Sequence, residues 1–231
     1  MRRPIAAPRL IAESQVQISE SEHTPMGSIS FIGLGGMTNA IAARAVKGGN
    51  TVELIGRDAA KAKSLAATLG GGATAGTFGA VPTGDIVVLA VPYTNAAQVA
   101  AQYGSALAGK VLIDISNTFN ADATRVVTPE GTSGAQEIAK VVPESAHVVK
   151  AFNTVFGHVL AQDGSRDVLF AGDDAEAKAI VSAFITSLGL RPLDAGGLEM
   201  ARWLEGVGPL LMGLARNGAG FNIAVGINTL N

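Results

Sequence analysis

The sequence predicts an α/β fold in which helices cover both faces of a doubly wound, mostly parallel sheet. Three observations carry this prediction. Short apolar runs alternate with helical segments along most of the chain, which is the order that βαβ units need. The run at residues 85–90 is nearly continuously apolar, as a strand buried on both faces must be, and residues 110–115 are expected to form another buried strand. Glycines follow several helical segments and stop them.

The elements can be assigned in chain order. Eight strands are expected, at residues 29–32, 51–55, 73–77, 85–90, 110–115, 147–152, 167–171 and 190–193. Helices are expected from the glycines after the first strand to residue 47, over 58–69, over 95–103, after 174 and from 198 onward. The last helix is expected to be interrupted by Gly206, Gly208 and Pro209.

The helix after residue 174 has two features that we interpret in detail. Asp173 and Glu176 resemble a capping box, although serine or threonine is the usual first member. Ile180, Phe184 and Leu188 repeat at helical spacing, which predicts that all three face the core.

A glycine-rich turn follows the first strand and opens the first helix. Gly33 allows the chain to turn sharply, and Gly35 has no side chain, so the backbone can approach a pyrophosphate. The N–H groups and the dipole of the following helix favour phosphate charge. Thr38 stands where the third glycine of the fingerprint is expected. Strand, turn and helix in this order predict a Rossmann-type dinucleotide site.

The end of the second strand favours NADP over NAD. NAD sites usually have an acidic residue there, whereas this chain has Gly56-Arg57. A guanidinium can bind a 2′-phosphate through two hydrogen bonds, and Lys61 adds a second positive charge. Asp58 is expected to cap the next helix. The alternative is that Arg57 and Lys61 are ordinary solvated cations.

Composition limits the other classes of function. The 231-residue chain is 48% hydrophobic and 16% charged with a net charge of −2, so overall charge does not drive nucleic-acid or membrane binding. There is no cysteine, and the three histidines form no HExxH-like pair, so no metal site is expected. No apolar run is long enough to span a bilayer. We expect a cytoplasmic protein that acts on small molecules.

Ligands bind at the carboxyl ends of the strands in such sheets. No Ser-His-Asp set, close carboxylate pair or Tyr-xxx-Lys motif occurs there. Hydride transfer between two bound rings needs positioning more than acid–base help. Lys150 and His158 are the candidate bases, and we interpret both as structural. No catalytic residue is assigned, and Asn153 is the candidate for positioning. The residues at the strand ends are 91–93, 116–118, 151–153 and 194–196.

These residues resemble the coenzyme F420-dependent NADP oxidoreductases. The resemblance covers residues 28 to about 217, and its most distinctive part is the segment 189–196. The other matching features are the glycine turn, Gly56-Arg57 with Lys61, segments 89–93, 149–153 and 170–174, and Leu198, Arg202, Glu205 and Pro209-Leu210.

The resemblance implies where the cofactor and its acceptor lie. NADP would cross the glycine turn with its 2′-phosphate on Arg57 and Lys61, and Asn153 would face the nicotinamide. The deazaflavin would lie in an acceptor cleft toward Gly196, Gly197 and Leu198. The whole implied cofactor set is Gly33, Leu34, Gly35, Gly36, Met37, Thr38, Gly56, Arg57, Lys61, Ala90, Val91, Pro92, Asn117, Ala151 and Asn153.

The expected domain organisation has three parts. Residues 1–27 form a flexible N-terminal extension, 28–150 an NADP-binding Rossmann domain, and 151–231 a small C-terminal domain with helices and strands. The C-terminal domain would supply the acceptor cleft and the contacts of a homodimer. Leu210, Leu211 and Leu214 are the expected dimer face.

Several functions stay open at this point. The first is hydride transfer between NADP(H) and F420 or a flavin, since the same fold serves as the reductase part of membrane ferric reductases. The second is a regulatory protein that senses NADPH without turnover. The third is a small-molecule dehydrogenase of the imine-reductase or hydroxyacid type, although those enzymes usually have a longer helical C-terminal domain.

Overall fold

A single eight-stranded sheet runs through the computed structural model, which describes residues 27–230. The strand order is β3-β2-β1-β4-β5-β6-β7-β8. The first six strands are parallel, β7 is antiparallel to β6, and β8 is parallel to β7. The predicted mostly parallel α/β fold is therefore confirmed.

The strands are close to those expected from the sequence. They are β1 (Ser28–Ile32), β2 (Thr51–Gly56), β3 (Thr74–Thr77), β4 (Ile86–Leu89), β5 (Val111–Asp114), β6 (His147–Ala151), β7 (Asp167–Gly172) and β8 (Arg191–Asp194). Every residue of β4 and β5 is buried, which agrees with their apolar runs.

The helices connect these strands. They are α1 (Gly36–Lys47), α2 (Ala59–Leu69), α3 (Tyr93–Tyr103), α4 (Gly134–Ala139), α5 (Gly157–Leu160), α6 (Ala175–Ser187) and α7 (Ala201–Leu214). Shorter helical turns are η1 (Gly104–Leu107), η2 (Leu198–Met200) and the π-helical η3 (Ala215–Ala219).

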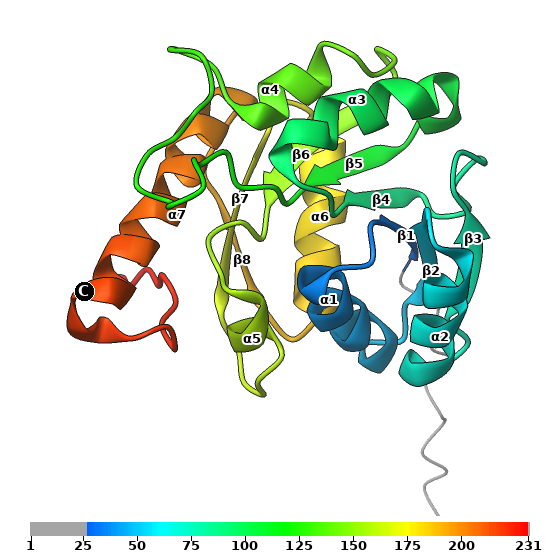
Figure 1. Cartoon of the computed structure of the whole chain (residues 1–231), viewed down its shortest axis with the longest axis horizontal. Coiled ribbons are helices and arrows are strands. Elements are labelled where there is room, and N and C mark those ends of the chain that lie inside the picture. The colour runs from blue at the N-terminus through cyan, green and yellow to red at the C-terminus, as the bar shows by residue number, and fades with distance from the viewer. Residues whose placement is uncertain (1–26, 231) are drawn as a thin grey trace, which may run out of the picture.

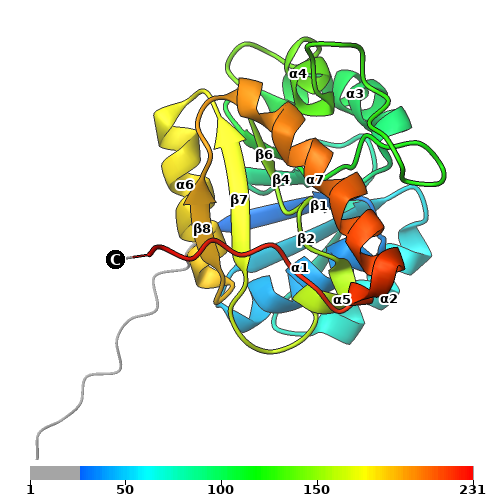
Figure 2. The same ribbon diagram turned by 90° about the vertical axis from the view of Figure 1, so that its left-hand side faces the viewer.

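Helices cover both faces of the sheet, as a doubly wound fold requires. Buried side chains of α1, α2, α5 and α6 pack on one face, and those of α3, α4 and the start of α7 pack on the other. Figure 1 shows α1 and α2 on one side of the strands and α3 and α4 on the opposite side. Figure 2 shows α6 beside β8 and α7 crossing in front of the sheet.

The start of α6 and its core face differ from the sequence prediction. The N-cap is Asp174, whose side chain accepts from the N–H of Ala177 at 2.7 Å, while Asp173 accepts from the N–H of Leu198. Phe184 and Leu188 are buried as expected, but Ile180 is 38% exposed. The buried stripe runs one position further, because Val181 rather than Ile180 faces the sheet.

The predicted interruption of the last helix is wrong. α7 continues through Gly206, Gly208 and Pro209. Gly208 packs closely, since a Cβ there would lie 3.0 Å from Oδ1 of Asn117. Pro209 lies inside the helix although it lacks the backbone N–H donor of other residues.

The expected boundary after residue 150 falls inside β6, and β7 and β8 extend the same sheet beyond it. The division into two domains stays a prediction. The expected N-terminal extension lies outside the described residues except for Gly27. Between residues 27 and 230, no helix combines the length and the apolar character that crossing a membrane requires.

Candidate functional site

A cavity of about 400 Å³ opens beside the glycine turn, at the carboxyl ends of β1, β2 and β4. It brings together many of the residues that the sequence predicted for the cofactor. Its lining consists of Gly33, Leu34, Gly35, Gly56, Arg57, Asp58, Lys61, Phe78, Ala90, Val91, Pro92, Asn95 and Val99. Gly36 lines an adjoining cavity that shares Leu34, Gly35 and Lys61.

The two glycines of the turn have different surroundings. Gly33 has a φ of +117°, and a Cβ there would lie 2.1 Å from the carbonyl oxygen of Ala90. Gly35 is exposed, and a Cβ there would have no neighbour within 4 Å. α1 begins directly after Gly35 without a side-chain cap. The backbone at Gly35 is therefore open to a phosphate ligand at a helix N-terminus.

Thr38 is part of the turn rather than of the cavity surface. Its side chain is fully buried, and its hydroxyl donates to the carbonyl of Gly33 at 2.8 Å. A third glycine would lack this bond. The buried side chain of Thr38 therefore stabilises the conformation of the turn. The usual fingerprint, which has glycine at this position, did not predict this role.

Arg57 and Lys61 are exposed at the rim of the cavity. Asp58 caps α2 as predicted, since its side chain accepts from the backbone N–H of Lys61 at 2.9 Å. Within residues 27–230, neither Arg57 nor Lys61 forms an ion pair with a carboxylate. Both positive charges are thus available to an anionic ligand.

Three lining residues were missed by the sequence analysis: Phe78, Asn95 and Val99. Phe78 directly follows β3, and Asn95 and Val99 lie on α3. The signal for Phe78 was its position after a strand, because the carboxyl ends of parallel strands meet at one edge of the sheet. β3 is short and mostly exposed, so its end was hard to locate from the sequence.

A second group of predicted residues lies outside this cavity. Asn117 and Asn153 approach each other, with Nδ2 of Asn153 3.4 Å from Oδ1 of Asn117. The same Nδ2 donates to the carbonyl of Leu204 at 2.8 Å, which leaves the buried Oδ1 of Asn153 without a partner. Ala151 is fully buried. Met37 lies at the start of α1 against Gly157.

Asn153 follows a residue with unusual backbone geometry. Phe152 has a φ of +62°, although it is fully buried and is not glycine. Its ring packs edge-on against Phe184 with the centroids 6.2 Å apart. A left-handed non-glycine residue persists only where its surroundings fix it, so this segment holds Asn153 in a defined place.

Lys150 is buried and ion-paired, which agrees with the structural role that we expected for it. Its Nζ lies 2.7 Å from Oδ2 of Asp114, 3.1 Å from Oε1 of Glu205 and 2.6 Å from the carbonyl of Ser116. The side chains of the three charged residues are completely buried. Glu205 also accepts from the hydroxyl of Thr118 at 2.8 Å. This cluster connects α7 to β5 and β6.

The other titratable groups near these strand ends are also engaged. His158 is exposed, and its Nε2 lies 2.8 Å from the carbonyl oxygen of Phe221. The hydroxyl of Tyr93 donates to Glu137 at 2.9 Å. Burial, followed by the contact with Glu137, raises the pKa of Tyr93 to about 12, so this hydroxyl stays protonated at neutral pH.

Comparisons with known proteins agree with this geometry. Residues 28–118 match the family model described as NADP oxidoreductase, coenzyme F420-dependent. The chain is also 33% identical over 144 residues to the F420-dependent NADP reductase of Methanocaldococcus jannaschii. That match covers 58% of this chain and 64% of the archaeal protein. Over these residues the chain is similar to the F420-dependent NADP oxidoreductase family.

Two further proteins that the chain resembles extend the comparison. It is 30% identical to metalloreductase STEAP3 of Rattus norvegicus over 215 residues, which covers 90% of this chain and 41% of that protein. The crystal structure of the hypothetical protein SMa0349 from Sinorhizobium meliloti has a TM-score of 0.68 and 31% identity, covering 74% of this chain and 85% of that one. The chain thus spans less than two thirds of both curated relatives.

The predicted acceptor cleft at Gly196, Gly197 and Leu198 is not at the same strand ends as the glycine turn. The chain reverses at β7, so β8 runs antiparallel to β6 and ends toward His147. The carbonyl of Gly196 accepts from the N–H of Gly172, and Leu198 is buried in the core. The acceptor cleft at these residues, which the resemblance implied, stays a prediction.

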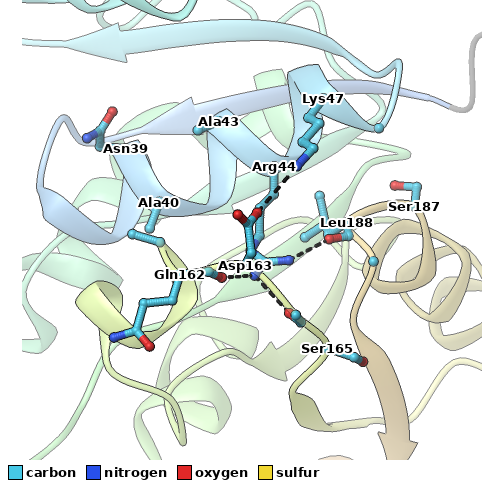
Figure 3. Close-up of a pocket in the computed structure, with 14 residues that line it drawn as sticks. Asn39, Ala40, Ala43, Arg44, Lys47, Gln162, Asp163, Ser165, Ser187 and Leu188 are labelled. Atoms are coloured by element: carbon cyan, nitrogen blue, oxygen red, sulfur yellow. Dashed lines mark hydrogen bonds and ion pairs between the residues drawn. The ribbon is translucent and has the colours of Figure 1, made fainter. Parts of the chain in front are cut away.

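A larger cavity, of about 500 Å³, lies between α1, the loop after α5 and the end of α6 (Figure 3). Arg44 occupies its centre and donates to the carbonyls of Leu160, Leu188, Gln162 and Gly164. Lys47 pairs with Asp163 on its rim. No lining residue is shared with the glycine-turn cavity, and these charged groups already have partners. The glycine-turn cavity is therefore the better candidate for function.

Proposed function

We propose that the chain is an NADP(H)-dependent oxidoreductase that transfers hydride between NADP(H) and a deazaflavin such as F420 or a flavin-type acceptor. The observation that carries this proposal is the pair of cations, Arg57 and Lys61, which form no ion pair within residues 27–230 and lie at the rim of a cavity that the open backbone of Gly35 also lines. The open backbone at Gly35 can bind a pyrophosphate, and the two cations can bind a 2′-phosphate.

Different residues of the cavity would contact different parts of the cofactor. The turn from Gly33 to Gly36 would hold the pyrophosphate, and Arg57 with Lys61 would hold the 2′-phosphate. Val91 and Pro92, which also line the cavity, would contact the inner half of the cofactor. When bound, NADPH supplies the hydride, that is, two electrons and one proton delivered together, and becomes NADP⁺.

Asn153 is proposed to orient the nicotinamide. Because the carbonyl of Leu204 can only accept, Nδ2 of Asn153 must face it, and Oδ1 is left as an unused buried acceptor. The carboxamide of nicotinamide has N–H donors that match this oxygen. A buried polar atom without a partner is costly, so a ligand that satisfies it is favoured.

The candidate acid–base groups that the structure describes at these strand ends already have partners, which suits this reaction. Lys150 is held by two carboxylates, and Tyr93 is bound to Glu137. Hydride transfer between two rings depends on positioning and exclusion of water, with little demand for proton transfer by the protein. Reduction of a carbonyl or an alcohol dehydrogenase reaction would need a proton donor or acceptor.

Replacement of Arg57 tests the cofactor assignment. We expect Arg57→Ala to raise the Kd for NADPH about 10- to 100-fold, since a hydrogen bond to a charged group contributes about 1.5–3 kcal/mol. The Kd for NADH should change little. Lys63→Ala is the matched control, because Lys63 is an exposed cation on α2 that lines none of the cavities described. An equal loss of affinity for both nucleotides would contradict the 2′-phosphate role.

We also propose that the chain forms a homodimer through α7. Leu210 and Leu214 are 59% and 50% exposed, and Trp203 on the same side of the helix is 62% exposed. Leu211, which the sequence analysis included in this face, is instead buried. The proposed contact surface, which we call the α7 face, therefore consists of Trp203, Leu210 and Leu214.

A further inference from the structure

Phe78 lies against Arg57 on the wall of the glycine-turn cavity. Gly56 at the end of β2 is paired in register with Thr77 at the end of β3, so the next residues, Arg57 and Phe78, emerge side by side. The guanidinium carbon of Arg57 is 5.6 Å from the centroid of the Phe78 ring. This distance is within the range of a cation–π contact.

An aromatic partner has a different effect on Arg57 from a carboxylate. A carboxylate would accept the N–H donors of the guanidinium and cancel its charge. The face of a ring attracts the cation but leaves the N–H groups in the guanidinium plane free to bind oxygen atoms. Arg57 is exposed, and without Phe78 its long side chain would sample many rotamers.

The ring of Phe78 is itself held in place by Tyr103, at the end of α3. The ring of Tyr103 meets it edge-on, with centroids 5.7 Å apart and an interplanar angle of 82°. Tyr103 is buried, and its hydroxyl accepts from the backbone N–H of Gly79 at 3.1 Å. The segment after β3 is thus bound to α3, and Phe78 has a defined position from which to hold Arg57.

We propose that Phe78 is a positioning residue that determines coenzyme specificity. It pre-orders the guanidinium of Arg57 at the rim of the cavity, so that binding a 2′-phosphate costs less side-chain entropy. A dinucleotide with a 2′-hydroxyl would gain little binding free energy from this arrangement. The inference deepens the proposed function and rests on it, because it concerns the same cavity and the same ligand.

The test compares Phe78→Leu with Phe78→Tyr. Leucine keeps the apolar contact with Tyr103 but has no ring, whereas tyrosine keeps the ring face. We expect Phe78→Leu to raise the Kd for NADPH about two- to fivefold, the effect of losing an exposed cation–π contact, with the Kd for NADH nearly unchanged. Phe78→Tyr should retain the wild-type ratio of the two constants. Both are measured by fluorescence of the bound reduced nucleotide.

The Arg57→Ala background separates this role from a purely structural one. If Phe78 acts through Arg57, adding Phe78→Leu to Arg57→Ala should not weaken NADPH binding further. An equal rise in both dissociation constants would overturn the inference, because it would mean that Phe78 contacts the adenosine portion common to both nucleotides. An unchanged NADPH constant in Phe78→Leu would also overturn it.

The experiment distinguishes this inference from the proposed function. A wild-type chain that binds NADPH and NADH equally would overturn the proposed coenzyme class and the role of Phe78 together. A wild-type chain that prefers NADPH, with a preference that Phe78→Leu leaves intact, would overturn the role of Phe78 alone.

Discussion

At the scale of single residues, the two glycines of the turn serve different purposes. Gly33 is required by the fold, because its φ is +117° and a Cβ would overlap the carbonyl of Ala90. Gly35 has a φ of −89°, which any L-residue adopts, and it has open space around it. Gly35 is therefore needed for the ligand and not for the fold.

This difference predicts opposite results for two valine substitutions. Gly35→Val should keep the circular dichroism spectrum and the thermal midpoint of the wild type while losing NADPH binding, because the side chain fills the place of the pyrophosphate. Gly33→Val should lower the thermal midpoint strongly. Retained NADPH affinity in a folded Gly35→Val variant would show that the pyrophosphate binds elsewhere.

The backbone and side-chain geometry at Phe152 and Asn153 could be predicted only in part from the sequence. The sequence predicted that Asn153 follows a strand, and it does. It could not predict that Phe152 is left-handed or that Asn153 donates to the carbonyl of Leu204, 51 residues away. Those features arise from tertiary contacts with α6 and α7, which leave no local pattern in the chain.

At the scale of elements, the buried cluster of Asp114, Lys150 and Glu205 attaches α7 to the sheet. Each charged side chain is completely buried, so removal of one partner leaves an uncompensated charge in the interior. The cluster lies next to Ser116 and Thr118, at the ends of the same strands that carry Asn117 and Asn153. It therefore stabilises the edge that the nicotinamide is proposed to occupy.

We expect Lys150→Met to lower the free energy of unfolding by about 3–5 kcal/mol, the usual cost of breaking a buried ion pair. Glu205→Gln should also destabilise the protein. Glu199→Gln is the control, since Glu199 is exposed on η2 and forms no ion pair within residues 27–230. Urea denaturation measures all three. A loss below 1 kcal/mol for Lys150→Met would contradict the structural role of the cluster.

Strands were predicted more accurately than helices for a physical reason. Strands buried on both faces have apolar runs that are visible locally, as Ile86–Leu89 of β4 and the first three residues of β5 show. α7, by contrast, contains glycines and a proline, which locally disfavour a helix and indicated a break. The structure shows one continuous helix, in which Gly208 packs closely against Asn117.

At the scale of the whole molecule, the chain reverses at β7, which the sequence analysis did not predict. The glycine turn, Arg57, Lys61 and the residues from Ala90 to Pro92 lie together because the parallel strands β1, β2 and β4 end at one edge. Gly196, Gly197 and Leu198 lie away from that edge because β7 and β8 run antiparallel to β6, and the acceptor cleft there stays a prediction. Strand direction is set by the length and packing of connections, and composition does not encode it.

The α7 face of Trp203, Leu210 and Leu214 predicts self-association. Sedimentation velocity at micromolar concentration should show a dimer, and Leu210→Asp should shift it toward monomer by placing charges in the interface. Val81→Asp is the control, because Val81 is 66% exposed but lies outside α7. A wild-type chain that sediments as a monomer would contradict the proposed dimer.

The proposed reaction is tested most directly by anaerobic oxidation of NADPH in the presence of purified protein, with F420 and FMN supplied in parallel. The account predicts turnover with at least one of these acceptors, one acceptor molecule reduced per NADPH, and much slower oxidation of NADH. Tight NADPH binding without oxidation by either acceptor would contradict the account and would favour a protein that senses NADPH.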